Sequence, residues 1–223
     1  MTLNEICTMI ASHMDKEFDE PFKLIIAEKV RVWRSRLIKN SVDKDERERK
    51  FFIQTVFMRM EERNEAECEV PYTQCKVAWS VDKVPKPLRA NGMLFDYIGS
   101  LNGMNAFKSS PVGMMTFMQA GRYSANVIYY LYENEKIKIY GNSKLPIIRI
   151  DGIFDDPEAA AQLSCGSINS KCNFWNEEYP ASGDIIQLII QSILQIDYNR
   201  VPYTETKQIP VIRENYAKNI PSQ

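Results

Sequence analysis

The spacing of apolar residues changes twice along this chain, and that double change restricts its fold more than any other feature. Residues 21–40 repeat apolar side chains every three or four positions, which predicts a long helix. From about residue 55 the repeat becomes alternate, in TVFMRM, which predicts a strand. The helical spacing returns in residues 184–196, where a largely buried helix is expected. The chain is therefore expected to bracket a β-rich middle between helical ends.

Three local patterns add detail to this order. Residues 2–13 predict a short helix, because Thr2 and a glutamate three positions later form a capping box. Residues 127–132 and 136–140 flank the sequence ENE, whose asparagine tolerates the left-handed conformation of a tight turn, so they predict a β-hairpin. Residues 146–150, PIIRI, predict one more strand.

The expected fold class is α+β: a helical bundle, built by the N-terminal helices and a C-terminal helix, with a β-rich insertion and an extended C-terminal arm. The expected parts are residues 1–54 (N-terminal part of the bundle), 55–151 (β-rich insertion), 152–197 (C-terminal part of the bundle) and 198–223 (arm).

The last part has three prolines and no period, so it does not belong to a compact core. It is either a disordered tail or an arm that becomes ordered on a partner. Its apolar side chains outnumber what a solvated tail needs, which favours the arm. The predicted partner-binding residues are Tyr198, Val201, Tyr203, Ile209, Val211, Ile212 and Tyr216.

The charge balance bears on possible partners. The chain has 28 basic and 29 acidic residues, a formal net charge of −1, which argues against a dedicated nucleic-acid binder. The helix predicted at 21–40 nevertheless carries a run of basic side chains against one acid on the face opposite its apolar stripe. Such a face is usually only solvated, but contact with an acidic partner or with DNA phosphates stays open. Its members are Lys23, Lys29, Arg31, Arg34, Arg36 and Lys39.

No pattern points to catalysis or a membrane. The only histidine, His13, excludes sites with several histidines, and no GxSxG or other nucleophile motif accompanies it. No export signal is recognised at the N-terminus, and no apolar run has the 18 or so residues of a membrane span. We therefore expect a non-enzymatic protein with no catalytic residue, cofactor or metal ligand.

The cysteines leave one alternative. Four of the five cysteines form two pairs along the sequence, Cys68 with Cys75 and Cys165 with Cys172, and each pair has six residues between its members. Zinc sites typically place paired ligands about two to four residues apart. Free thiols are the favoured interpretation, and a zinc-stabilised accessory module is the alternative. Its ligands would be Cys68, Cys75, Cys165 and Cys172.

The sequence DGIFDDPEAA, at residues 151–160, places three acids, Asp151, Asp155 and Asp156, within six residues. It could form a metal or acid–base site, or it could start a helix. Asp156 precedes Pro157, which is suited to a first helical position, and Glu158 complements the helix dipole. The alanines that follow are strong helix formers. A helix start is therefore the favoured interpretation.

An ordered set of segments carries a family resemblance over nearly the whole chain. These segments are TLNEI, RVWRSRLIKN, FFIQTVFMRME, KVPKP, LYENEKIKIY, IIRIDGIFDDPEAAA and NEEYP. With them the chain resembles the head–tail connector (ring or adaptor) proteins of crAss-like and related short-tailed Bacteroidetes bacteriophages. GIFDDPEAA with the preceding hairpin is the most specific part.

The resemblance implies a virion structural protein at the head–tail interface, made in the host bacterial cytoplasm. It implies a homo-oligomeric ring, often a dodecamer, that docks under the portal protein and extends the DNA conduit towards the tail. Further tail or ring proteins would be its neighbours, packaged DNA would pass through its lumen, and a C-terminal arm would contact the portal. The alternative from the residues alone is a small zinc-stabilised or DNA-contacting accessory protein.

Overall fold

The computed structural model of the chain describes residues 1–41, 49–64, 76–89, 94–109, 127–140, 144–164 and 174–199. Within these ranges the chain forms four α-helices and seven strands. The helices are α1 (Leu3–His13), α2 (Glu20–Ser41), α5 (Pro157–Ser164) and α6 (Gly183–Ser192), joined by a 3-10 turn, η2 (Phe174–Asn176), and a π-helical turn, η3 (Ile193–Asp197). The strands are β1 (Gln54–Asn64), β2 (Lys76–Ser80), β3 (Tyr97–Gly99), β4 (Lys108–Ser109), β5 (Tyr129–Glu133), β6 (Lys136–Tyr140) and β7 (Ile147–Gly152).

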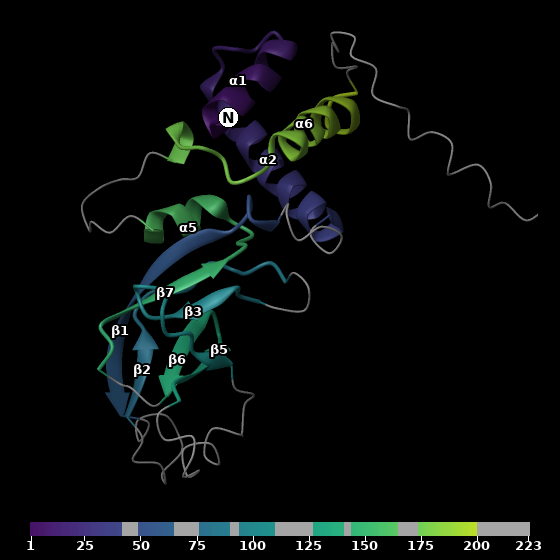
Figure 1. Cartoon of the computed structure of the whole chain (residues 1–223). Helices are drawn as coiled ribbons and strands as arrows, with labels where there is room; N and C mark the ends of the chain where they lie inside the picture. The colour runs from purple at the N-terminus through teal and green to yellow at the C-terminus, as the bar shows by residue number, and fades with distance from the viewer. Residues whose placement is uncertain are drawn as a thin grey trace, which may run out of the picture.

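One sheet in the order β3-β7-β1-β2-β6-β5-β4 contains all these strands (Figure 1). The long strand β1 is the third in this order and changes partner along its length. Its first half, from Gln54 to Arg59, pairs with β7, and its second half, from Met60 to Asn64, pairs with β2. All pairings are antiparallel except that of β4 with β5.

The two ends of the sheet meet. A bridge joins Gly99 at the end of β3 to Ala106, and Phe107 N donates to Ile98 O at 2.7 Å, just before the chain enters β4. The result is a nearly closed, barrel-like sheet. Gly99 is required at this closure, because a Cβ there would overlap the Asn105 carbonyl oxygen and the Tyr97 ring.

The alternation of side chains along each strand explains which residues fill the interior of the barrel-like sheet. In β7, Ile148 and Ile150 are fully buried while the residues between them are partly exposed, as a strand with one face inward requires. Val56 and Met58 of β1 and Ile139 of β6 join them in one apolar core. The enclosed core is therefore built by residues far apart in sequence.

The helices form a second layer at one end of the sheet (Figure 1). Helix α1 starts with the expected capping box, in which Glu5 N donates to Thr2 Oγ1 at 3.1 Å and Thr2 N to Glu5 Oε2 at 2.9 Å. Asp19 caps α2 by accepting from Phe22 N at 2.9 Å. Helices α1, α2 and α6 share one apolar core, to which Phe52, Leu88 and Ile153 also belong.

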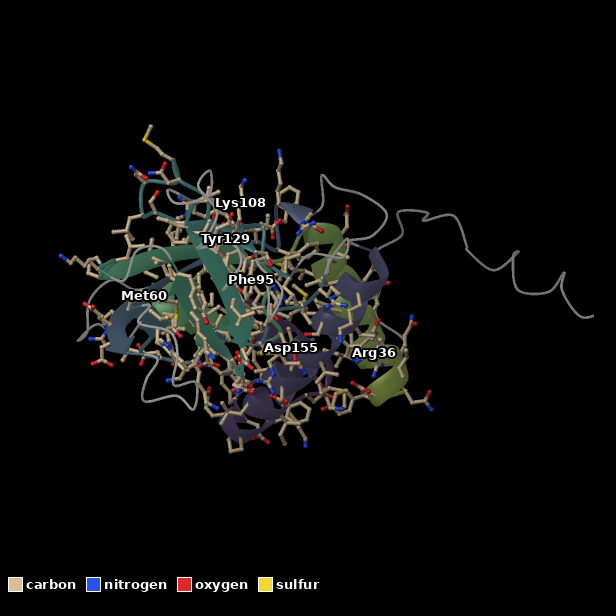
Figure 2. All side chains as sticks on the ribbon, turned by 90° about the horizontal axis from the view of Figure 1, so that it is seen from below. Arg36, Met60, Phe95, Lys108, Tyr129 and Asp155 are labelled. Atoms are coloured by element: carbon tan, nitrogen blue, oxygen red, sulfur yellow. The ribbon has the colours of Figure 1, made fainter. Side chains whose placement is uncertain are left out.

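Helix α5 links the two layers. Ala160 packs in the core of the sheet, whereas its neighbour Ala161 packs in the core of the helices. Figure 2 shows Asp155, just before this helix, between the strands and α2, while Arg36 lies at the outer side of the helical layer. The segment that starts α5 is thus the junction of the molecule.

The predicted local elements are present, but the predicted fold class is wrong. The hairpin is confirmed by β5 and β6, and its turn places Asn134 and Glu135 at φ 51° and 60°. The fold is not a helical bundle with a β-rich insertion: it is a mixed α/β fold dominated by the seven-stranded, nearly closed sheet. The strands dominate because β1 pairs with both β7 and β2, and the sheet that results encloses an apolar core of its own. Residues 200–223, the rest of the predicted arm, lie outside the described residues.

No helix among the described residues is both long enough and apolar enough to cross a membrane.

Candidate functional site

The acids of DGIFDDPEAA do not converge on one site. Asp156 caps α5, because its Oδ1 accepts from the backbone N–H groups of Glu158 at 3.0 Å and Ala159 at 3.1 Å. The predicted helix start is therefore confirmed. Asp151 instead lies in β7, where it accepts two hydrogen bonds from Arg149, at 2.9 and 2.8 Å. Asp155 uses its backbone, accepting from the Ser35 hydroxyl at 3.3 Å.

The second oxygen of Asp156 ties α5 to α2. Arg31 donates through Nη1 to Asp156 Oδ2 at 2.8 Å and through Nη2 to Glu28 Oε1 at 2.6 Å. Partial burial is the largest single influence on the pKa of Arg31 and lowers it. The two carboxylates together outweigh it, so the pKa of Arg31 lies above its ordinary value. Within the described part of the chain, no three histidine, cysteine or acidic side chains gather as a metal site would need. Arg31 and Asp156 thus clamp α5 to α2.

Arg34 of α2 makes a second link between the helices and the sheet, from the interior of the protein. It is fully buried, and burial lowers the pKa of its guanidinium. It donates to the carbonyl oxygens of Phe154 at 2.8 Å and Pro180 at 3.0 Å, and lies 6.0 Å from the Tyr179 ring centre. One helix side chain thus holds the segment after β7 and the segment before α6.

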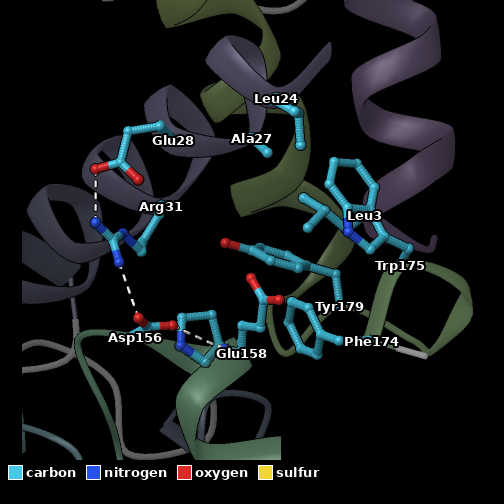
Figure 3. A pocket seen from close by; sticks show the side chains of 11 residues that line it. Leu3, Leu24, Ala27, Glu28, Arg31, Asp156, Glu158, Phe174, Trp175 and Tyr179 are labelled. Atoms are coloured by element: carbon cyan, nitrogen blue, oxygen red, sulfur yellow. Dashed lines mark hydrogen bonds and ion pairs between the residues drawn. The ribbon is translucent and has the colours of Figure 1, made fainter. Parts of the chain in front are cut away.

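Beside this junction lies a cavity of about 180 Å³. Figure 3 shows it between α2, the start of α5 and η2, with the Tyr179 ring reaching into it. Its floor and walls are mixed: Leu3, Phe174 and Trp175 supply apolar surface, and Glu28, Arg31, Asp156 and Glu158 supply charge. The Tyr179 hydroxyl is buried and has no hydrogen-bond partner among the described residues.

A second hollow adjoins the first. It is lined by Asn4, Glu20, Leu24, Trp175 and Asn176, so the two share Leu24 and Trp175. We call the two together the α2 groove. Leu24 is 61% exposed at their boundary, which is a high value for a leucine.

The α2 groove is acidic. Its lining includes four carboxylates, those of Glu20, Glu28, Asp156 and Glu158. Arg31 in the lining and Lys23, which pairs with Glu20, offset two of these four negative charges. A segment with apolar and basic side chains has the chemistry to occupy it. The sequence interpretation missed this site, because Trp175 and Tyr179 stand in a stretch without a period.

The predicted basic face of α2 is not gathered by the structure on one surface. Arg34 is interior, Arg31 is clamped to Asp156, and Lys23 pairs with Glu20 at 3.0 Å. Lys29 pairs with Asp197 at 3.3 Å, Arg36 lies 4.6 Å from the Trp33 ring centre, and Lys39 is exposed. A signal for the burial of Arg34 is present in the sequence: it continues the i+4 row of Ile26, Val30 and Ile38, all of which are buried.

Asp197 and Tyr198, near the end of the described residues, contact α2. Asp197 accepts from Trp33 Nε1 at 3.1 Å and pairs with Lys29. Tyr198, the first predicted arm residue, lies 5.8 Å from Phe22, ring centre to ring centre, and its ring is 5.1 Å from Lys29 Nζ. The other predicted arm residues, Val201, Tyr203, Ile209, Val211, Ile212 and Tyr216, lie outside the described residues, as do Cys68, Cys75, Cys165 and Cys172.

The buried thiol of Cys7 and the buried phenol hydroxyl of Tyr179 are weak acids, and their burial predicts a loss of stability at alkaline pH. Burial raises the pKa of the Cys7 thiol and of the Tyr179 hydroxyl to about 12 each, whereas in an unfolded chain these groups titrate near about 8.5 and 10. The folded protein keeps both protons where the unfolded chain releases them, so the unfolding free energy should fall as pH rises from about 9 to 12. Urea unfolding across this range should show a shallower fall for Tyr179→Phe than for the wild type above about pH 10. An unchanged slope would contradict the assignment for Tyr179.

Comparison with known proteins gives one family. No curated protein matches the chain. A family model described as "Phage tail ring protein 2" matches residues 5–208, which include every described helix and strand except the first two residues of α1. The match supports a virion component that takes part in a ring. The chain therefore belongs to the crAss-like phage tail ring protein 2 family.

Proposed function

We propose that the protein is a non-enzymatic subunit of a ring that connects the portal or head to the tail and extends the DNA conduit. The observation that carries the proposal is the match of residues 5–208 to a phage tail ring family. The ring would be homo-oligomeric, with twelve copies expected from the resemblance to connector proteins. The portal protein and other tail or ring proteins would be its neighbours, and packaged DNA would pass through its lumen.

The geometry of the described residues supports a structural role. Two acids of DGIFDDPEAA are engaged: Asp156 caps α5 and pairs with Arg31 of α2, and Asp151 pairs with Arg149 within β7. General acid–base work needs a group free to exchange a proton with a substrate, whereas the carboxylates of Asp151 and Asp156 bind partners of the protein itself. The groove beside them instead offers a surface on which another polypeptide can lie.

Electron microscopy of purified virions tests the proposal. The chain should fit a ring between the portal and the tail, and its peptides should be found in the same particles by mass spectrometry. A position at the capsid surface or at the tail tip would contradict the connector role. Absence of the protein from purified virions would contradict a structural role altogether.

A further inference from the structure

The α2 groove has the features of a binding site that its own described residues do not fill. Leu24 is 61% exposed at its boundary, and the Tyr179 hydroxyl is buried without a hydrogen-bond partner among the described residues. Figure 3 shows that hydroxyl pointing into the cavity. A buried hydroxyl without a partner is destabilising, so an occupant that supplies an acceptor, such as a backbone carbonyl, would offset this cost.

The end of the described chain lies on the other side of α2. Phe22, Lys29 and Trp33 hold Asp197 and Tyr198. An α-helix turns about 100° per residue, so these three side chains lie roughly 180° around α2 from Leu24 and Arg31 of the groove. The chain therefore continues into residue 200 from the side of α2 that faces away from the groove.

The sequence beyond that point matches the groove in chemistry. Residues 200–223 contain four basic side chains against two acids, whereas the groove has four carboxylates against Arg31 and the Lys23 that pairs with Glu20. The same segment carries Tyr203, Ile209 and Ile212, which suit the apolar surface of Leu24 and Trp175. Opposite charges of this kind steer a partner and fix its register.

We propose that the α2 groove of one copy binds the C-terminal segment, residues 200–223, of the neighbouring copy. This inference rests on the proposed ring. A head-to-tail contact uses two different surfaces of each subunit, and repeated rotation closes it into a ring. Here the two surfaces are the segment that leaves one side of α2 and the groove on the opposite side. A segment of 24 residues spans up to about 80 Å when extended, so its length allows it to reach beyond its own subunit.

Two full-length variants with matched exposure test the groove. Leu24→Lys removes apolar surface and places a charge of the same sign as the segment at the boundary of the two hollows. Ile25→Lys is the control, because Ile25 is also exposed, at 54%, but is absent from the groove lining. Sedimentation velocity over a range of concentrations should show assembly of the wild type and of Ile25→Lys, and association about tenfold or more weaker for Leu24→Lys. Thermal unfolding should show that both variants are folded.

Mixing gives a second, sharper readout. A full-length triple variant, Lys207→Glu, Arg213→Glu and Lys218→Glu, reverses the charge of the segment but keeps the groove. Alone it should associate about tenfold or more weakly than the wild type, as Leu24→Lys should, so both are monomeric at a concentration where the wild type assembles. Each still offers one intact surface, so their mixture should form a 1:1 complex and nothing larger.

Four outcomes would overturn the inference: a wild type that stays monomeric at every concentration, Leu24→Lys that assembles like the wild type, equal loss for Leu24→Lys and Ile25→Lys, or a mixture that forms no 1:1 complex. None of them would contradict the proposed function, which depends on where the protein lies in virions. Conversely, a protein absent from virions could still show this self-association in solution.

Discussion

Arg34→Ala is expected to lower the free energy of unfolding by about 3 kcal/mol or more. The guanidinium is fully buried and donates to the carbonyl oxygens of Phe154 and Pro180. Its removal leaves both acceptors without their charged donor and opens a cavity between the two layers. For a chain of this size the melting temperature should fall by about 6–12 °C. Urea unfolding followed by circular dichroism measures the difference.

Arg36→Ala is the matched control, two residues further along the same helix. Arg36 is exposed and contacts the Trp33 ring, 4.6 Å from its centre. Removing an exposed cation–π contact costs about 0.5–1 kcal/mol. If both variants lost the same small amount, Arg34 would not be the link between the helices and the sheet.

Gly99→Ala is expected to destabilise the protein by about 2–4 kcal/mol. The added methyl group would overlap the backbone carbonyl oxygen of Asn105, and backbone cannot move aside as the end of a flexible side chain can. It would also displace the Tyr97 ring, whose hydroxyl donates to that carbonyl at 3.0 Å. The bridge between Gly99 and Ala106 should open, and with it the closure of the sheet.

Gly183→Ala provides the comparison. A methyl group at Gly183 meets nothing within 4 Å, and the residue begins α6, where alanine is a better helix former. Its unfolding free energy should be unchanged or slightly higher. Hydrogen exchange should show faster exchange at Phe107 N–H in Gly99→Ala only. Equal protection of that amide in both variants would mean that the closure tolerates a side chain at Gly99.

Local structure was predictable from the sequence because its causes are local. The capping box at Thr2 and Glu5, the cap at Asp156 and the tight turn at Asn134 each depend on residues within four positions of one another. The hairpin and the helix starts therefore have their predicted places.

Local patterns could not predict that a seven-stranded sheet would dominate the fold. This dominance depends on which strand pairs with which, and β1 pairs with β7, almost a hundred residues later, as well as with β2. The closure of the sheet depends on a few bonds around Gly99 and Ala106, in a stretch that shows no clear alternation. Short strands leave too few residues for a period to be recognised.

The candidate site was hidden for a different reason. Basic residues on a helix are usually solvated, so Arg31 and Arg34 were grouped with the exposed cations of α2. One is the partner of a helix cap and the other is an interior donor, and only the position of Arg34 in an apolar row indicates this. The groove itself is assembled from α1, α2, α5 and η2, whose proximity no local pattern specifies.

The closure of the sheet also limits how copies of this protein can join. An open sheet ends in strands whose free N–H and C=O groups can recruit a strand from another molecule, and such addition has no natural end. Here the strands at the two ends of the described sheet are bonded to each other through residues 98–107, so that route to fibrous growth is blocked. Within the described residues, any contact between copies would then use side-chain surfaces rather than the edges of the sheet. For a member of a phage tail ring family, the closure of the described sheet is therefore a safeguard against uncontrolled polymerisation.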